Sequence, residues 1–424
     1  MFCAATEGQS EKLNELISSV GHVTAKDNNG RTILHLASER GYLDTVRLVL
    51  VKGIEIDSEC GAGHTALICA AKHGYEHIVQ LLLDNSASIN KRGGSMTALE
   101  AAARNGHEQT ARLLLDRGAK IDEYGGSTAL EAAARNGHEQ TVRLLLDRGA
   151  EIGSTALEAA ARNEHEQTVR LLLDRGAEIG STALEATARN GHEQIIRLLL
   201  DRGAKIDEYG GSMALGGAAI NGHEQTARLL LDRGAEIGST ALKATARNGH
   251  EQIIRLLLDR GAKINEYGGS MALGEAARNG HEQIVRLLLD RGGKNDSENM
   301  GSARALRQAA REGHANVVQL LLDEGVNVNS TTRSKRSALS YAAEKGHAAV
   351  VQLLLHWCAD IKSTDNRGRT VLSWASGNTE TYGGQRITTR LHKNEEQRDA
   401  IVRLLLEEKA RRDSIMDGRD NLVR

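Results

Sequence analysis

The chain has 424 residues, enough for two or three ordinary domains or for one long repeat array. Its net charge is −2 and the charges are mixed in sign along the chain, so nothing in the composition points to nucleic acid or an anionic membrane as a partner. Proline is absent and only 2% of the residues are aromatic, which argues against a core built on aromatic side chains and favours thin layers of Leu- and Ala-rich helices.

Self-similarity dominates the chain from its first residues onward. The segment "AATEGQSEKLNELI" near the N-terminus is the remainder of a unit that then recurs, and residues 128–154 match residues 155–181 except at position 164. About thirteen units cover nearly the whole chain. The complete units begin at Thr32, Thr65, Thr97, Thr128, Thr155, Thr182, Met213, Thr240, Met271, Arg304, Ser337 and Thr370.

Each unit is expected to form two antiparallel helices. In the unit from Thr128, the threonine hydroxyl can cap the short Ala-rich helix "ALEAAARN", which Gly137 ends. The segment "HEQTVRLLL" then has apolar residues at helical spacing, and Gly149 follows as a terminating glycine. One such pair cannot bury its apolar face alone, so the units must stack.

This unit resembles the ankyrin repeat, most clearly in "TILHLASERGYLDTVRLVLVKGIEID" at 32–57 and "SALSYAAEKGHAAVVQLLLHWCADI" at 337–361. "DNNGRT" at 27–32 and "DNRGRT" at 365–370 resemble the hairpin turns of that family. The resemblance implies an all-α solenoid of about 13 stacked helix–turn–helix units with short or truncated β-hairpin fingers.

Two positions depart from the family pattern. The family's proline is alanine or another residue in every unit, which a helix N-terminus tolerates. The family's histidine is kept at His35 but is glutamate in several units, which puts its usual side-chain hydrogen bonds in question. The glutamates are Glu100, Glu131, Glu158 and Glu185.

The length of the loop after the second helix predicts where fingers are missing. "GVNVNSTTRSKRS" at 325–337 has the full ankyrin length, and "GAKIDEYGGST" at 118–128 is two residues shorter. "GAEIGST" at 149–155, 176–182 and 234–240 is six residues shorter, too short for a projecting hairpin. We therefore expect the finger to be missing at these three junctions, while the helix pairs still stack.

The expected domain organisation is a single ankyrin-repeat array over residues 1–424. Residues 1–31 form a partial repeat, which either caps the array or is the remainder of a longer one, and residues 32–376 hold the repeats. Residues 377–397 form an exposed polar insertion in the last repeat, and residues 398–424 form a capping helix and tail.

No set of residues has the asymmetric arrangement of an active site, so we predict no catalytic residue, metal site or cofactor, and no enzyme. "GHEQ" resembles part of the zinc motif H-E-x-x-H, but Ala111 and Val142 stand where the second histidine is needed. We instead expect His107, His138 and His165 to cap the second helix and to bond to the adjacent unit. "RSKR" at 333–336 is interpreted as a solvated loop rather than a nuclear-targeting signal.

The cysteines indicate the compartment. Cys3, Cys60, Cys69 and Cys358 are scattered, which is typical of reduced intracellular thiols. No apolar run reaches the roughly 18 residues of a membrane helix, and the N-terminus lacks signal-peptide features. We expect a monomeric intracellular protein, cytoplasmic rather than nuclear, with a protein partner and without membrane insertion or nucleic-acid binding.

The candidate protein-binding residues form charged rows, because equivalent residues of stacked helices lie roughly 10 Å apart on one face. The glutamate row becomes Gly216, Lys243 and Gly274 further along the chain, and the arginine row is interrupted by Ile220. Solvated charge is the alternative interpretation of both rows. The residues are Glu100, Arg104, Glu131, Arg135, Glu158, Arg162, Glu185, Arg189, Lys243 and Arg247.

Three tyrosines complete the candidate surface. Tyr124, Tyr209 and Tyr267 lie in the loops "DEYGG", "DEYGG" and "NEYGG", where we expect finger tips. Exposed tyrosine is a frequent interface anchor, and packing within a turn is the alternative role. Tyr341, Trp357 and Trp374 near the C-terminus either anchor a second contact or pack the end of the array.

The function expected from these features is non-catalytic protein–protein recognition or scaffolding through the concave surface of the repeats. The alternatives are an accessory repeat region of a larger signalling, NTPase or effector protein, and a mechanical spacer. "GRTVLSWA" together with "LLLDRGA" resembles the ankyrin proteins that are abundant in filamentous fungi, some of which join such arrays to NTPase or effector domains.

Position 164 is the exception within the repeat "RNGHEQ". Gly137 and its equivalents end the first helix, where we expect a positive φ. Glu164 at such a position should cost about 1–2 kcal/mol relative to glycine. Because the neighbouring loops are also shortened, we expect a weak joint in the array here.

Overall fold

A computed structural model of the chain describes residues 2–20, 24–121, 128–206, 210–238, 240–264, 267–293, 300–376, 381–382, 385–386 and 395–420. These residues form 26 α-helices, which make thirteen consecutive pairs, together with one π-helical turn and two short strands. The fold is therefore an all-α solenoid of helix pairs, as the sequence predicts. The chain divides into two compact units, Met1–Lys205 and Ile206–Arg424.

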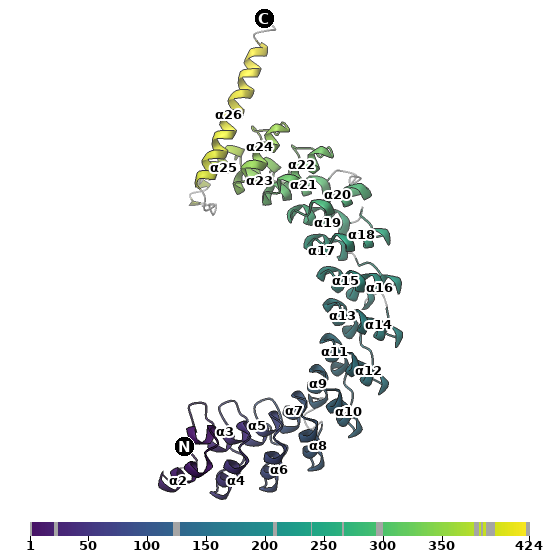
Figure 1. Ribbon diagram of the computed structural model, residues 1–424. Coiled ribbons are helices and arrows are strands. Elements are labelled where there is room, and N and C mark those ends of the chain that lie inside the picture. The colour runs from purple at the N-terminus through teal and green to yellow at the C-terminus, as the bar shows by residue number, and fades with distance from the viewer. Residues whose placement is uncertain are drawn as a thin grey trace. The chain divides into compact units, whose positions relative to one another are not determined.

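The first unit contains seven helix pairs. Its odd-numbered helices lie along one side and its even-numbered helices along the other (Figure 1), and we call them inner and outer helices. The bounds are α1 Phe2–Thr6, α2 Ser10–Val20, α3 Ile33–Arg40, α4 Leu43–Val51, α5 Ala66–Lys72, α6 Glu76–Asp84, α7 Ala98–Arg104, α8 Glu108–Asp116, α9 Thr128–Arg135, α10 Glu139–Asp147, α11 Ser154–Arg162, α12 Glu166–Asp174, α13 Ser181–Asn190 and α14 Glu193–Asp201.

The second unit contains six helix pairs, again with inner helices odd and outer helices even (Figure 1). The bounds are α15 Gly210–Asn221, α16 Glu224–Asp232, α17 Ala241–Asn248, α18 Glu251–Asp259, α19 Tyr267–Arg278, α20 Glu282–Leu288, the π-turn η1 Leu289–Gly293, α21 Met300–Glu312, α22 Ala315–Asp323, α23 Ala338–Lys345, α24 Ala348–His356, α25 Val371–Ser376 and α26 Glu395–Asp420.

Within a pair, the inner helix packs mainly through alanine side chains and the outer helix mainly through leucine and valine side chains. In α9, Ala133 and Ala134 are fully buried, and their small side chains let neighbouring inner helices approach closely. In α10, Val142 and Leu145 are also fully buried. Each fully buried leucine contributes about 1.5–3 kcal/mol of hydrophobic stabilisation, so stacking the repeats supplies a continuous core without aromatic residues.

The turn between the two helices of a pair demands glycine for two reasons. Gly137 has φ +72°, in the left-handed region that the sequence predicts. In addition, a Cβ atom at Gly137 would lie only 2.4 Å from Nδ1 of His165 in the next pair. Glu164 also has a positive φ of +65°, which confirms the expected strain at this position. The close approach of the next histidine is a second constraint that the repeat pattern alone did not reveal.

Helix caps differ between long and shortened junctions. Thr97 accepts a hydrogen bond from the Glu100 N–H and completes a capping box at α7, as expected. At the last of the three shortened junctions Thr240 occupies the N-cap position of α17 but makes no side-chain cap hydrogen bond. At the other two the prediction of a threonine cap is wrong, because Gly153 and Gly180 occupy the N-cap positions of α11 and α13. With six residues fewer, the chain enters the helix before it reaches the threonine.

Fingers are present where the loops have full length. The turn "DNNGRT" is closed by hydrogen bonds within residues 27–31, and Gly61 N donates to Asn29 O (2.8 Å), which joins it to the next finger. In the second unit, Thr331 bridges to Ser337 and Thr364 bridges to Thr370. In contrast, α10 ends at Asp147 and α11 begins at Ser154, so the intervening residues connect the helices directly. The predicted loss of fingers at the short loops is confirmed.

After two of the loops of intermediate length the inner helix begins early. In the second unit, α15 begins at Gly210 and α19 begins at Tyr267, and each has 12 residues. The placement of Tyr267 at a finger tip is therefore wrong, since Tyr267 is the first residue of the inner helix α19. Tyr124 and Tyr209 lie outside the described residues.

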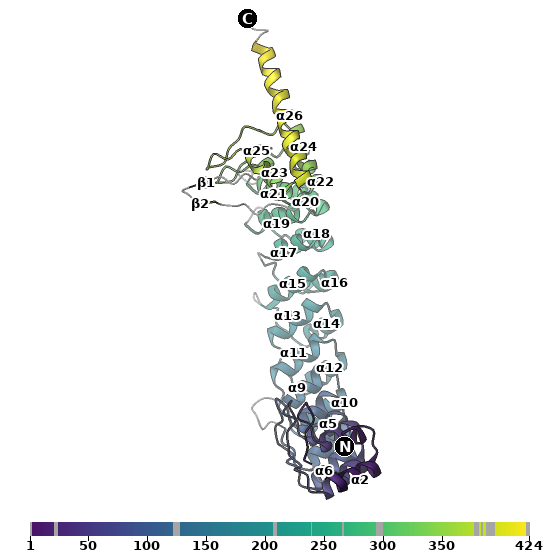
Figure 2. The same cartoon turned by 90° about the vertical axis from the view of Figure 1, so that its left-hand side faces the viewer.

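The last repeat contains a small β-hairpin. Within the segment expected to be a polar loop, β1 (Thr381–Tyr382) pairs antiparallel with β2 (Gln385–Arg386) and stands out to one side of the helices of this unit (Figure 2). The expectation of an irregular loop is corrected at these four residues, where alternating backbone groups form a ladder.

Helix α26 packs against the end of the second unit. Ile401 and Leu405 are buried, and α26 contacts α24 and α25. Arg412 donates to the carbonyl oxygens of Leu355 (3.0 Å) and Ala359 (2.9 Å), which places positive charge at the C-terminal end of α24. Side-chain hydrogen bonds from Arg411 and Arg412 lower the pKa of Glu408 to about 2. In the described part of the chain, no helix combines the length and the apolar character needed to cross a membrane.

Candidate protein-binding surface

In α9, α11 and α13 the charged rows of the first unit consist of ion pairs within single helices. Arg162 pairs with Glu158 (2.5 Å), Arg189 pairs with Glu185 (2.6 Å), and Arg135 pairs with Glu131. The three arginine side chains are more than half exposed, so each pair contributes about 0.3–0.5 kcal/mol to its helix. These residues therefore present a neutral, solvated stripe on the inner helices.

Four predicted residues of the first unit surround one hollow. Glu100, Arg104, Glu131 and Arg135 line a depression of about 360 Å³ between α7 and α9, together with Ser95, Ala132 and Asn136. Glu100 is only 6% exposed, because its carboxylate accepts a hydrogen bond from the Thr97 N–H in the capping box. Glu100 therefore has a structural function at the start of α7 besides lining the hollow.

The row changes character in the second unit. Lys243 and Arg247 occupy one face of α17, and no carboxylate among the described residues forms an ion pair with either. The reason is that Lys243 stands where the first unit has glutamate, so Arg247 has no acidic residue one helical turn earlier. The second unit therefore presents unpaired positive charge where the first unit presents ion pairs.

A cationic pocket lies further along the same face, on α21. Arg304, Arg307 and Arg311 line a hollow of about 250 Å³ with Gln308, Thr332 and Tyr341. The repeat pattern places Arg304 at the start of a unit but does not reveal the pocket. The available signal was Arg307, which replaces the glutamate of the consensus unit.

Two of the C-terminal aromatic residues, Tyr341 and Trp374, pack against arginine side chains. The Arg336 guanidinium lies 3.9 Å from the ring centre of Tyr341 and 3.8 Å from that of Trp374, and Arg369 stacks on Trp374 at 3.8 Å. Trp374 is 9% exposed. Such stacking contributes about 0.5–2 kcal/mol per contact and supports a packing function for Tyr341 and Trp374. Trp357 lies separately, at the C-cap of α24.

The histidines of "GHEQ" connect neighbouring repeats. His138 donates from Nε2 to the carbonyl oxygen of Arg104 (3.0 Å), and His165 donates in the same way to Arg135 (3.0 Å). Both occupy N-cap positions but make no side-chain cap hydrogen bond, so only the predicted bond to the adjacent unit is confirmed. Since Nε2 donates to a carbonyl and Nδ1 lies against the preceding glycine turn, the contacts of these rings serve repeat stacking.

A second ladder follows the ends of the outer helices. In the first unit Arg148 pairs with Asp116 (2.9 Å), Arg175 with Asp147 (2.9 Å) and Arg202 with Asp174 (2.9 Å), each arginine reaching back to the previous repeat. The repeated "LLLDRG" supplies both partners of this ladder, since its aspartate pairs with the arginine of the next copy.

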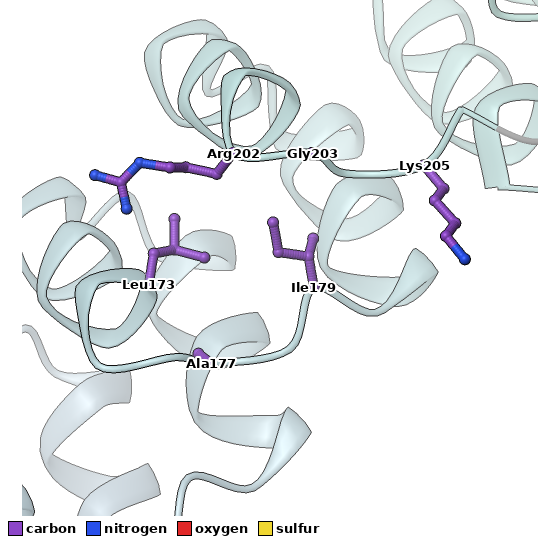
Figure 3. Close-up of a pocket in the computed structure, with 6 residues that line it drawn as sticks. All are labelled: Leu173, Ala177, Ile179, Arg202, Gly203 and Lys205. Atoms are coloured by element: carbon purple, nitrogen blue, oxygen red, sulfur yellow. The ribbon is translucent and has the colours of Figure 1, made fainter.

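Beside this ladder the short loop after α12 leaves an open hollow of about 360 Å³ (Figure 3). Its lining includes Leu173, Ala177, Ile179 and Gly203, while Lys205 extends away from Leu173. Arg202 also lines the hollow, but its guanidinium is already paired with Asp174. We regard the hollow as space left by the shortened loop.

Comparison with known families decides the identity of the fold. The sequence model of ankyrin repeats (three copies) matches residues 1–93, 90–156, 122–182, 157–240, 215–299 and 305–384. The chain belongs to the ankyrin-repeat family. Ankyrin repeats generally mediate protein–protein interaction, and the fold is typically non-catalytic.

Curated relatives match over short stretches. The probable E3 ubiquitin-protein ligase XBOS33 of Oryza sativa subsp. japonica is 44% identical over 50 residues, which are 12% of this chain and 10% of the rice protein. The calmodulin-binding transcription activator CBT of the same species is 36% identical over 78 residues, 18% of this chain and 8% of that protein. The ankyrin repeat and KH domain-containing protein mask of Drosophila melanogaster is 34% identical over 97 residues, 22% of this chain and 2% of that protein. The matches span a tenth or less of each relative.

Among solved structures, the human ASB11 ankyrin repeat domain is similar with 26% identity and a TM-score of 0.44, covering 48% of this chain and 96% of that chain.

The ankyrin histidine position can now be compared with its replacements. His35 donates from Nε2 to the His64 carbonyl (2.9 Å), joining two repeats, whereas Glu158 and Glu185 pair with arginines of their own helices. The substitution therefore exchanges a hydrogen bond between ankyrin repeats for an ion pair within one repeat.

Proposed function

We propose that this chain is a non-catalytic recognition array that binds a protein through the inner-helix face of its ankyrin repeats, with residues 1–424 acting as one array. The observation that carries the proposal is a difference between inner helices of the two units: Glu158 and Arg162 form an ion pair within α11, whereas no described carboxylate pairs with Lys243 or Arg247 of α17. Charges of a partner can compensate the unpaired cations, which favours orientation and association rate.

The proposal includes the finer expectations drawn from the sequence. We place the chain inside the cell, as a monomer and scaffold, and we assign it to the ankyrin type abundant in filamentous fungi because of "GRTVLSWA" and "LLLDRGA". The candidate tyrosines Tyr124, Tyr209 and Tyr267 remain proposed contact residues.

An accessory function in a larger protein is the second candidate. The names of the three relatives attach ubiquitin ligation, calmodulin-binding transcription activation and a KH domain to proteins that this chain matches only over short repeat segments. By analogy, the array would bring a partner to an activity located elsewhere. Both candidates require a protein to bind to the repeats, whereas a mechanical spacer does not.

Proximity labelling in the native cell tests recognition against the spacer. The test variant carries Lys243→Glu and Arg247→Glu on inner helix α17. The matched control carries Arg228→Glu and Arg255→Glu on outer helices α16 and α18, with the same change in net charge. We expect the inner-face variant to lose specific labelled proteins that the control retains. Identical labelling by the wild type and both variants would contradict inner-face recognition.

A further inference from the structure

Charge reversal at position 307 distinguishes α21 from the consensus repeat. In α11, Glu158 precedes Arg162 by one turn and pairs with it, but α21 has Arg307 in the place of that glutamate, one turn before Arg311. Like charges at this spacing destabilise a helix by a few tenths of a kcal/mol. Helix α21 thus has a repulsive pair, Arg307 and Arg311, at the two positions where α11 has the attractive pair Glu158 and Arg162.

The arginines of this pocket have weak partners. Arg307 is half-buried and donates a long hydrogen bond to Ser330 Oγ (3.4 Å), and Arg304 donates to the thioether sulfur of Met271 (3.0 Å), a weak acceptor. Burial, followed by the neighbouring Arg304, lowers the pKa of Arg307, against the opposing effect of Tyr341. Of the described carboxylates, only Glu312 pairs with any of these arginines, at 3.8 Å from Arg311.

Glu312 does not neutralise the pocket. Its carboxylate also lies 3.8 Å from Nε of Arg278, so two guanidinium groups share one distant carboxylate. Gly274, at the consensus glutamate position of α19, contributes no charge, and a Cβ there would lie 3.5 Å from Nε of Arg304. The pocket therefore has an excess of positive charge that the protein itself does not balance within the described residues.

The adjacent fingers extend the positive surface. Thr332 of the pocket belongs to the hairpin that Thr331 and Ser337 close, and this hairpin displays Arg333 and Lys335 to solvent. The next finger is fastened to it, because Asn366 donates to the carbonyl oxygens of Ser334 (3.1 Å) and Arg333 (3.0 Å). The cationic rim is thus held at a defined place beside the pocket.

The chemistry of the pocket selects its ligand. Guanidinium groups match the planar geometry of a carboxylate and form charge-assisted hydrogen bonds with it. The Tyr341 ring, the aromatic group of the pocket, already has the Arg336 guanidinium on it, which disfavours the base stacking that single-stranded nucleic acids use.

We propose that the pocket of Arg304, Arg307 and Arg311 binds an acidic side chain of a peptide segment in a partner protein, with further acidic residues of that segment against Arg333 and Lys335. This inference rests on the proposed recognition function and names the chemistry of the partner segment.

Two substitutions that restore the consensus test the proposal. Arg307→Glu re-creates the Glu–Arg pair with Arg311 that α11 contains, and Gly274→Glu places a carboxylate beside Arg304 while increasing helix propensity. Both variants should keep or improve folding, so a loss of binding cannot be attributed to unfolding. Arg228→Glu on outer helix α16 is the charge-matched control for Arg307→Glu.

Fluorescence anisotropy of the full chain with fluorescein-labelled polyglutamate, length-matched polyglutamine and oligouridylate provides the measurement. We expect polyglutamate to bind, its affinity to fall with added salt, and Arg307→Glu and Gly274→Glu each to weaken it by about tenfold, since losing a charge-assisted hydrogen bond has that magnitude. Arg228→Glu should change the affinity by less than about threefold.

Equal affinity of wild type and Arg307→Glu for polyglutamate would overturn the proposal that this pocket binds an acidic side chain. Tighter binding of oligouridylate than of polyglutamate, if it depended on Arg307, would overturn it as well. If cellular partners were still captured in either case, only the acidic-peptide inference would fail. Absence of any captured partner would instead reject the recognition function.

Discussion

Glu164→Gly is the substitution whose effect can be worked out most directly from the structure. Glu164 has φ +65°, and a left-handed conformation costs a residue with a side chain about 1–2 kcal/mol. Glycine removes this strain but loses about 0.4–1 kcal/mol through the greater freedom of the unfolded chain.

One local interaction opposes the substitution. The Glu164 carboxylate lies 3.4 Å from Nδ1 of His192, but the glutamate side chain is 71% exposed, so the pair contributes about 0–1 kcal/mol and only when His192 is protonated. With His192 neutral, the two backbone contributions combine to raise the local free energy of opening for Glu164→Gly by about 0–1.6 kcal/mol, centred near 0.8 kcal/mol, and loss of the pair with a protonated His192 reduces this gain. Glu164→Gln keeps the backbone strain and isolates the contribution of the carboxylate.

The sequence supplies a matched reciprocal variant. Gly137→Glu introduces glutamate at the same position of an otherwise identical repeat, and it should destabilise the turn by about 1–2 kcal/mol. Its penalty has a second source, because the new Cβ would meet His165 Nδ1 at 2.4 Å unless the ring moves.

Native-state hydrogen exchange followed by mass spectrometry measures both variants. Peptides covering residues 158–170 and 131–143 report on the two turns, and chemical denaturation reports on the whole chain. Slower exchange around Glu164→Gly together with faster exchange around Gly137→Glu is expected. No slowing for Glu164→Gly, with Gly137→Glu also neutral, would refute the argument from backbone strain.

Three further predictions follow from caps and titratable groups. Thr97→Ala should destabilise the α7 region by about 1 kcal/mol in chemical denaturation, whereas Thr155→Ala, inside α11 and exposed, should change stability by less than about 0.5 kcal/mol; equal losses would contradict the difference in capping. Because the pKa of Glu408 is lowered from 4.5 to about 2, its stabilising contribution is complete above pH 4.5 and is lost as the pH falls toward 2; acid titration of helix content should show this loss in wild type and not in Glu408→Gln, and identical titrations would exclude the contribution. Burial raises the pKa of Cys69 to about 12, so mass spectrometry after iodoacetamide treatment at pH 8 should find Cys3 and Cys358, which are exposed, alkylated and Cys69 unmodified; rapid alkylation of Cys69 in the native chain would show that its site opens.

The helix pairs and their ends were predictable from local pattern. Alanine and leucine recur at helical spacing, and glycine stands where the backbone must become left-handed, as at Gly137. Loop length correctly predicted missing fingers before Thr155, because a hairpin needs a minimum number of residues. The same argument failed for the loop before α19, since helix extension from Tyr267 satisfies the backbone as well as a finger does.

The position of the candidate surface was predictable from the sequence, but which of its charged side chains form ion pairs within the protein was not. The rows containing Arg135 and Lys243 follow from the repeat period, which places equivalent residues on one face. Whether a charge is already neutralised within the protein depends on neighbouring side chains. Glu131 pairs with Arg135, whereas no carboxylate in the described part of the chain pairs with Lys243. The pocket at Arg307 went unnoticed because its finger residue, Thr332, is distant in sequence.

The sequence by itself determined the family, the number of repeats and the loss of fingers at the shortest loops, because each depends on local spacing that recurs in every repeat. Only the tertiary structure decided which arginines are neutralised, why a glycine turn must leave room for the histidine of the following repeat, and where Arg304, Arg307 and Arg311 surround a hollow. These features depend on distances between residues that are neighbours in space and about one repeat or more apart in sequence, and a repeat pattern does not specify such distances.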